Sequence, residues 1–497
     1  MQFRIFLKLN LIKKLMKPIS TGIDIRKQID ELLLADDLEG VLRTIENTVD
    51  TVFIEPLNTA EIFGDRTLDK ICQKTGEKCL LKIKKTAEFH SFNKNKLSDQ
   101  TTHTVFIVSR LQASGGHTAL LADIAKQSKR KISLLVTGIG GSTNLESIHH
   151  IFEKIENLQF EFAPTGSRLI KLEWLQRKLL SLRPEIVWLF NHHQDSVAIA
   201  AVQPDQGYRL KFLHHGDHHL CLGVFLEFGE HYDPHPMGFH NCRGRLLNLN
   251  NRYLPLVIDD PQLRPVKKNN GPLISCTAAS SNKVEHTYWP SYSDVVPEIL
   301  AKTGGTHIHI GRLSWFYRYR IKKLMRKKNI NPETFIYIPY VKSVALSLQH
   351  FNVDIYIASF PYAGARTLVE VMAAGIPTAG HDHRSSHMLS AVDMLPPMSY
   401  VWTHVDQLIN FIEAETKETL QERGKAARSY YEAHHTLEKF QIALEGDLSE
   451  QNIPQSSFLH KSDELLRALE KSWQFSIKGF ISRWIKLQAR KIKSIRS

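Results

Sequence analysis

The stretch Phe360-Pro-Tyr-Ala-Gly-Ala-Arg-Thr-Leu-Val-Glu-Val-Met-Ala-Ala-Gly-Ile-Pro377 decides how this chain of 497 residues is interpreted. Residues 354–359, around its start, have the pattern of a strand, residues 362–365 that of a turn, and residues 366–374 that of a helix. The first N–H groups of a helix have no intrahelical partner, so a helix that follows a strand at a tight turn attracts phosphate. The stretch therefore predicts one unit of a parallel α/β sheet with an anion site at its turn.

Three polar side chains share one face of the first two turns of this helix. Arg366 and Glu370 are four residues apart, and Thr367 stands three residues before Glu370. A cation and a hydroxyl suit a diphosphate, and a carboxylate can accept both hydroxyl hydrogens of a ribose diol. The alternative is an ordinary amphipathic helix with an exposed Arg/Glu pair. The chemistry of the segment favours a nucleotide-sugar site.

Short β-branched runs alternate with helix-length segments on both sides of a Pro- and Asn-rich linker at residues 261–272. The predicted strands are residues 105–108, 132–136, 186–190 and 210–213 before the linker, and 273–277, 307–310, 335–338, 353–358 and 376–379 after it. This pattern predicts two doubly wound, Rossmann-like domains facing across a cleft, at residues 101–262 and 268–445, the first for the acceptor and the second for the donor. Ligands of such sheets bind beyond the carboxyl ends of the strands.

The two ends of the chain differ from this pattern. Residues 1–100 have helical spacing followed by a polar linker, and residues 446–497 form a basic amphipathic tail. Within the tail, residues 473–497 alternate aromatic and aliphatic side chains with Lys and Arg, which suits an anionic membrane surface as well as a helix that packs back on the body.

Composition limits the partners and the compartment. The formal charge of +13 favours acidic partners such as sugar nucleotides, anionic membrane or nucleic acid. No nucleic-acid-binding module is recognisable, so nucleic acid is not expected as a partner. Five scattered cysteines without a CxxC pair indicate neither a disulfide framework nor a zinc ribbon. With no signal peptide or spanning segment recognised, we expect a cytoplasmic protein, either free or peripheral at the inner face of the membrane.

Glycine and histidine mark the predicted first domain. Gly115 and Gly116 follow its first strand and let a ligand approach the backbone closely, and His117 comes directly after them. Two later strands end in Asn191-His-His-Gln-Asp195 and Leu213-His-His-Gly-Asp-His-His219. From this set we expect substrate contacts from Gly115, Gly116, His117, His193, His214 and His218, and a general base in His215 or Asp217.

The same run suggests a metal site as a rival. His215-x-Asp217-His218 has the spacing of the last three ligands of the HxHxDH pattern in metallo-β-lactamase-type zinc hydrolases. Leu213 occupies the place of the first ligand, and the neighbourhood has the pattern of a parallel α/β sheet rather than of a β-sandwich. A zinc-dependent hydrolase using the His214–His219 loop therefore remains an alternative.

One lysine extends the predicted donor site. Lys283 follows the first strand of the second domain, from where an ammonium group can reach a diphosphate and stabilise the departing nucleotide. The alternative is an exposed cation like many of the 64 Lys and Arg residues. Its predicted position near the helix of Arg366 favours the functional interpretation.

Over residues 103–440 the chain resembles the GT-B glycosyltransferases. The block from Asp354 through Glu370-Val-Met-Ala-Ala-Gly-Ile-Pro377 is similar to the "D…P…G…T…E.MA.G.P" block of nucleotide-sugar transferases. Together with Lys283, the His-rich loop and His381-Asp-His-Arg-Ser-Ser-His-Met-Leu389, it resembles most the O-GlcNAc-transferase and bacterial cytoplasmic N-glycosyltransferase group, with family-4 transferases as the close second.

The resemblance implies a role for each matching residue. Lys283 and the residues Ala365, Arg366 and Thr367 would contact the diphosphate, Glu370 would hold the ribose, and the backbone of residues 337–340, with Tyr340, would face the base. At two positions the sequence differs from the motifs of these families. Tyr362 occupies the place of the second glutamate of family-4 enzymes, and Ala365-Arg-Thr stands where the O-GlcNAc group has His-Thr-Thr.

The sequence thus predicts a hexosyl- or N-acetylhexosaminyl-transferase that moves a sugar from a nucleoside diphosphate, UDP before other nucleotides, to a protein, glycan or lipid-linked acceptor. Lys283 would assist catalysis by stabilising the leaving group. No well-placed DxD motif is present, so transfer without a metal or other cofactor is expected. Besides the zinc hydrolase, a catalytically inactive GT-B binding protein remains an alternative.

Overall fold

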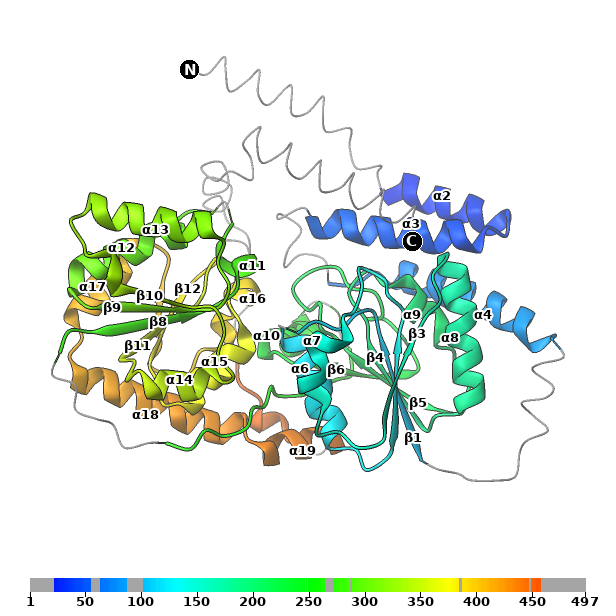
Figure 1. Cartoon of the computed structure of the whole chain (residues 1–497). Coiled ribbons are helices and arrows are strands. Elements are labelled where there is room, and N and C mark those ends of the chain that lie inside the picture. Colours follow the sequence, from blue (N-terminus) through cyan, green and yellow to red (C-terminus); the bar gives the residue numbers. More distant parts are fainter. Residues whose placement is uncertain are drawn as a thin grey trace, which may run out of the picture.

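The computed structural model describes residues 22–54, 63–86, 102–113, 115–245, 247, 249–263, 271–286, 288–383, 387–446 and 448–456. They form two α/β domains, each built on one parallel sheet (Figure 1). The predictions for residues 473–497 and for the first 21 residues lie outside the described residues. Among the described helices, none combines the length and the apolar character that a membrane crossing demands.

The first sheet has seven parallel strands in the order β3-β2-β1-β4-β5-β6-β7. Its strands are β1 His103–Val108, β2 Lys131–Val136, β3 Leu158–Phe162, β4 Ile186–Phe190, β5 Arg209–Leu213, β6 Gly229–Asp233 and β7 Asn251–Tyr253. The strand order reverses between β1 and β4, where Phe106 pairs with Trp188. At such a switch point a doubly wound sheet binds its ligands.

The second sheet repeats this topology with six parallel strands in the order β10-β9-β8-β11-β12-β13. Its strands are β8 Ile274–Ala278, β9 Thr306–Ile310, β10 Phe335–Ile338, β11 Ile355–Ile357, β12 Thr378–His381 and β13 Tyr400–Trp402. The order reverses between β8 and β11, so the loops that carry Lys283 and the helix of Arg366 leave neighbouring strands on the same side. The sheet topology thus brings the two halves of the predicted donor site together.

The central strands are apolar at nearly every position because both faces of each sheet are covered. In β1, Val105 and Ile107 belong to the core under one set of helices, while Phe106 and Val108 belong to the core under the other. The first set is α8 Arg168–Leu182 and α9 Ser196–Ala201, and the second is α6 Gly116–Lys126 and α7 Leu145–Phe152. Alternate residues of a strand point to opposite faces, which explains this division.

The N-terminal helices belong to the first domain. They are α2 Gly22–Leu34, α3 Leu38–Ile54 and α4 Arg66–Lys84. Ile29, Val41 and Leu42 are buried in the same core as Val105 and Leu175, and α4 packs on α8 and α9. The helical spacing predicted for this region is therefore present in its described part, where the helices complete the core of the domain.

Helices at the end of the described chain connect the domains. The second domain contains α11 Ser281–Val284, α12 Tyr292–Thr303, α13 Trp315–Lys327, α14 Val344–His350, α15 Ala365–Ala373, α16 His387–Ser390, α17 Val405–Ala414, α18 Lys417–His434 and α19 Leu437–Glu445. Phe440 of α19 shares a core with Trp188 and Tyr232 of the first sheet. Lys211 of β5 lies 3.4 Å from the Leu444 carbonyl, so the chain returns to the first domain after completing the second.

Strands β3, β6, β7 and β13 were not predicted from the sequence. The sequence of β6, Gly-Glu-His-Tyr-Asp, is mostly polar, and β7 and β13 have three residues each. Such segments lack a continuous apolar run, and they become strands because a neighbouring strand offers its backbone hydrogen bonds.

Candidate donor and acceptor sites

The N-terminus of α15 is open to an anion. Gly364 precedes the helix and has no side chain to cap it, so the first N–H groups keep their donor capacity. The Lys283 ammonium lies at the same turn and donates to the Ala363 carbonyl at 2.7 Å. Burial lowers the pKa of Lys283 to about 8. A partly buried ammonium beside free N–H donors is an arrangement that suits a diphosphate.

Glu370 occupies the next turn of α15 and has one oxygen already engaged. Its Oε2 accepts from the N–H groups of Val344 at 2.7 Å and Ala345 at 3.1 Å, which caps α14. Burial raises the pKa of Glu370, although the two N–H donors oppose this effect. Among the described residues no donor faces the other oxygen, Oε1, so it can accept a hydroxyl hydrogen. Thr367 stays close to the turn, because a Cβ placed on Gly364 would come within 3.0 Å of its Oγ1.

Arg366 points across the domain boundary. Its Nη1 lies 2.5 Å from Oδ2 of Asp123 on α6, and the pair bridges the two domains. The first turns of α6 and α15 are close neighbours here, because a Cβ on Gly116 would lie 3.9 Å from the Cβ of Arg366. In this structure Arg366 therefore neutralises Asp123, and it would have to turn from that carboxylate to reach a diphosphate.

Tyr340 lies apart from this group. It follows the edge strand β10, two strands away from β8, and 68 % of its surface is exposed. No contact joins it to Lys283 or Glu370 among the described residues. The structure thus leaves Tyr340 free to contact a base beyond the carboxyl end of β10.

Aromatic and imidazole rings form a group beside the Lys283 loop, where the Tyr362 N–H donates to the Lys283 carbonyl at 3.3 Å, and the sequence analysis did not identify them as a group. Tyr362 stacks on His383 with ring centroids 5.8 Å apart, and Tyr288 stacks on His383 at 5.1 Å. Tyr288 also joins His381 by a 3.0 Å hydrogen bond. These residues come from three separate loops, so no local motif identifies them.

Three imidazoles gather at the carboxyl ends of the first sheet. The rings of His117 and His215 are 4.3 Å apart, and that of His192 lies 5.3 Å from His117. Burial lowers the pKa of all three rings, that of His192 to about 2 and that of His215 to about 3. The rings are therefore neutral at physiological pH and can accept a hydrogen bond, and the lowered pKa makes each of them a weaker base than a free imidazole. Beside them Gly115 adopts a φ of +141°, and a Cβ there would meet nothing within 4 Å.

The carboxylate of Asp217 is already paired with two histidines. Its Oδ2 lies 2.5 Å from His235 Nδ1, and its Oδ1 lies 3.5 Å from His218 Nδ1. Burial by itself would raise the pKa of Asp217, but the two histidines outweigh it and hold the pKa below its usual range. The same contact overcomes burial in His235 and raises its pKa to about 9. Of the two predicted bases, His215 is the one whose ring makes no hydrogen bond or ion pair to any residue that the structure describes.

The structure does not bring His193 and His214 to this group. His193 packs against Phe53 and His219, with ring centroids at 4.4 Å and 4.5 Å, toward the N-terminal helices. His214 is fully buried and joins Asp233 at 2.9 Å. His192, which the sequence analysis quoted but did not select, takes the position expected of His193, because neighbouring residues after a strand point in different directions.

The zinc ligands expected of a hydrolase do not converge. In the part of the chain that the structure describes, His215, Asp217 and His218 do not bring three ligand atoms together. The surrounding sheet is parallel, as predicted for the α/β alternative. The geometry does not support a hydrolytic zinc centre on this loop.

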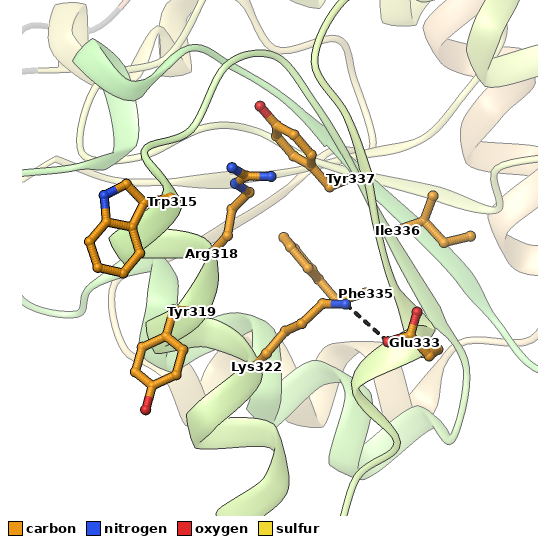
Figure 2. Close-up of a pocket in the computed structure, with 8 residues that line it drawn as sticks. All are labelled: Trp315, Arg318, Tyr319, Lys322, Glu333, Phe335, Ile336 and Tyr337. Atoms are coloured by element: carbon orange, nitrogen blue, oxygen red, sulfur yellow. Dashed lines mark hydrogen bonds and ion pairs between the residues drawn. The ribbon is translucent and has the colours of Figure 1, made fainter.

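A hollow of about 570 Å³ lies in the second domain (Figure 2). It is bordered by α13 and the edge strand β10, and it is lined by Trp315, Arg318, Tyr319, Lys322, Glu333, Phe335, Ile336 and Tyr337. The Arg318 guanidinium lies 4.4 Å from the centre of the Tyr337 ring, and Lys322 pairs with Glu333 at 3.1 Å. The lining of this hollow includes Tyr337, the first of residues 337–340, whose backbone is expected to face the base, but neither Lys283 nor Glu370.

Comparisons with solved structures support the two-domain arrangement. A glycosyltransferase from Rickettsia africae has a TM-score of 0.52 at 14% identity, over 71% of this chain and 100% of its own. The lipopolysaccharide outer core galactosyltransferase WaaB has 0.51 at 12% identity, over 70% and 100%. HepE of Anabaena in complex with UDP has 0.51 at 12% identity, over 69% and 99%. At this identity the likeness shows the fold, and the predicted GT-B fold is confirmed.

No protein-family model matches the sequence, and no curated protein matches it either.

Proposed function

We propose that this protein is a glycosyltransferase that uses a nucleoside-diphosphate sugar, with UDP as the nucleotide. The observation that carries the proposal is the meeting of Lys283, the uncapped N-terminus of α15 and the free oxygen of Glu370 at the switch point of the second sheet. Together they provide a cation, backbone donors and a diol acceptor. The solved structures of the same fold include a protein bound to UDP, which agrees with this choice.

The reaction follows from the two sites. The bond between the anomeric carbon and the diphosphate oxygen breaks, and Lys283 with the α15 N-terminus stabilises the negative charge that develops on the departing nucleoside diphosphate. The acceptor oxygen or nitrogen forms the new bond to the anomeric carbon. In the inverting form of the reaction, the neutral ring of His215 takes the acceptor proton. The residues present provide the leaving-group stabilisation themselves, so we propose transfer without a metal or other cofactor.

Calorimetric titration of the full chain with UDP and GDP in excess EDTA tests the donor site. We expect micromolar binding of UDP, weakened tenfold or more, about 1.4 kcal/mol, by Lys283→Ala and by Glu370→Ala. Lys302→Ala is the matched control, because Lys302 is an exposed lysine of the same domain, paired with Glu413. Equal binding by wild type and Lys283→Ala would refute the proposed role of Lys283. Binding without turnover over a panel of UDP-hexoses and UDP-N-acetylhexosamines would favour the inactive binding protein.

We further propose that the enzyme works at an anionic membrane surface on the cytoplasmic side, with a protein, glycan or lipid-linked acceptor. Helix α13 supports this proposal: Trp315, Phe316 and Tyr319 are 72 %, 60 % and 51 % exposed. The helix Trp-Phe-Tyr-Arg-Tyr-Arg-Ile-Lys-Lys-Leu-Met-Arg-Lys contains cations and no acidic residue. Exposed aromatic rings beside Lys and Arg suit the headgroup region of an anionic bilayer.

Sedimentation with phosphatidylserine vesicles tests the membrane proposal. Pelleting is expected for wild type and reduced for Trp315→Ala/Phe316→Ala. Deletion of residues 473–497 measures the contribution of the basic tail separately. Unchanged pelleting of both variants would refute these two surfaces as membrane contacts. Neutral phosphatidylcholine vesicles serve as the control for charge.

A further inference from the structure

Four buried side chains of the first domain bring metal-ligand atoms together. They are His214, directly after β5, His231 and Asp233 of β6, and Cys242 of the π-helix η2 Asn241–Arg245. Their ligand atoms all lie within 4.8 Å of one another, and none of the four residues is more than 7 % exposed. None of them takes part in the proposed transfer reaction.

Four of the six distances between the ligand atoms lie near the edges of a tetrahedron around zinc, and all six are within 4.8 Å. Zinc bonds of 2.0–2.3 Å to nitrogen, oxygen and sulfur place neighbouring ligand atoms about 3.3 to 3.6 Å apart. Cys242 Sγ lies 3.4 Å from both His214 Nδ1 and Asp233 Oδ1. His231 Nε2 lies 3.2 Å from Asp233 Oδ1, and His214 Nδ1 lies 2.9 Å from the same oxygen. Small outward movements of the side chains would admit the ion.

Charge also favours a dication here. Asp233 is 0 % exposed, and a carboxylate so deeply buried needs a compensating positive charge. A divalent ion with one carboxylate, one thiolate and two neutral imidazoles forms a site of zero net charge. Two nitrogens, one sulfur and one oxygen form a ligand set that zinc accepts.

The hydrogen bonds around the cluster bear on how the imidazoles of His214 and His231 are oriented. In the described structure, the outer nitrogens of these imidazoles, His214 Nε2 and His231 Nδ1, have no hydrogen-bond partner. The inner nitrogens face the cluster, and both rings also pack against Phe212, with ring centroids 5.9 Å and 5.2 Å from it. Asn251 donates to the second oxygen of Asp233 at 2.5 Å, which keeps Oδ1 turned toward the sulfur.

We propose that His214, His231, Asp233 and Cys242 bind one structural zinc ion. Four protein ligands leave no open position for water, so the ion stabilises the fold and does not activate a nucleophile. It ties the end of β5 to β6 and to η2. His215 follows His214 directly, so the ion also fixes the backbone that carries the proposed base.

Metal analysis of the full chain tests this proposal. The protein is purified without a metal-affinity tag and without chelator, and its zinc content is measured by mass spectrometry. One equivalent is expected in wild type, and loss of most of it in Cys242→Ala. Cys221→Ala is the matched control, because Cys221 is another buried thiol of the same domain and does not belong to the cluster. Zinc-free wild type that takes up no zinc on titration would refute the site, as would full zinc retention in Cys242→Ala.

A spectroscopic measurement on the wild-type chain tests the site without depending on whether a variant folds. Cobalt(II) added to the wild-type chain after zinc removal is expected to produce a thiolate-to-cobalt charge-transfer band. The band should persist in Cys221→Ala and vanish in Cys242→Ser. Wild-type cobalt spectra without a thiolate band would exclude Cys242 as a ligand. UDP titration of the same samples keeps the outcome separate from the donor site, because the cluster does not include any donor-site residue.

Discussion

Raising the pH from about 7.5 to about 9.5 is expected to weaken UDP binding by up to about 25-fold, the limit reached when the neutral lysine contributes nothing, because Lys283 loses its proton over this range. Burial lowers the pKa of Lys283 to about 8 in the ligand-free protein. With that pKa, the charged fraction falls from about three quarters to about 3 % between the two pH values. The ratio of these fractions corresponds to about 1.9 kcal/mol of binding free energy.

The sign of this pH effect follows from the coupling between proton binding and UDP binding. A bound diphosphate stabilises the ammonium and raises the pKa of Lys283, so binding takes up a proton wherever the free lysine is neutral. The contribution of Lys283 is therefore fully present only well below pH 8 and is lost as the pH rises through 8 and above. The terminal phosphate of UDP loses its last proton near pH 6, below the range of the experiment.

Calorimetry at several pH values, with Lys283→Arg as the matched control, measures this effect. The guanidinium stays charged throughout, so the affinity of Lys283→Arg should change much less with pH. Any titration of the ligand or of other groups appears equally in both proteins and is removed by comparing them. Identical pH profiles of wild type and Lys283→Arg would refute the argument that the Lys283 ammonium holds the diphosphate.

Three further perturbations test neighbouring contacts. Glu370→Ala leaves two N–H groups of α14 without their acceptor and should lower the free energy of unfolding by about 1 to 2 kcal/mol in denaturant titrations, whereas Glu370→Gln should retain most of this stability. Asp123→Asn removes the carboxylate that holds Arg366 and should strengthen UDP binding a few-fold in calorimetry, and unchanged affinity would show that Arg366 does not reach the nucleotide. Gly76→Ala should lower the free energy of unfolding by about 3 kcal/mol, because its Cβ would lie 1.7 Å from the Ala200 carbonyl oxygen, and a stable variant would refute the packing of α4 on α9.

The local structure of the proposed donor site could be predicted from contiguous sequence. The helix expected at residues 366–374 is α15 Ala365–Ala373, and Lys283 stands beside its start. Strand, turn and helix follow one another within a few residues, and a helix end attracts anions by its backbone alone. The rings of Tyr288 and His383 escaped prediction because their contact joins separate loops.

The first-domain half was predicted less completely. The sequence showed that histidines gather after two strands, but His192 and His215 face His117 while His193 and His214 turn to other parts of the core. Composition alone does not show which of two adjacent histidines points toward His117, since the direction of each side chain depends on how its loop leaves the sheet. The partner of Asp217, His235, lies eighteen residues further along the chain, in no local motif.

The sequence by itself determined the alternation of strands and helices, the division into two domains and the βα junction at Gly364, because each of these depends on neighbouring residues and on the periodicity of apolar side chains. Only the tertiary structure decided that Arg366 meets Asp123, that the N-terminal helices join the first core, and that His214, His231, Asp233 and Cys242 converge. These contacts depend on strand order and loop direction, which arise when distant segments share one sheet and one core. Side-chain chemistry can be recognised along the chain, but its convergence is a property of the folded arrangement.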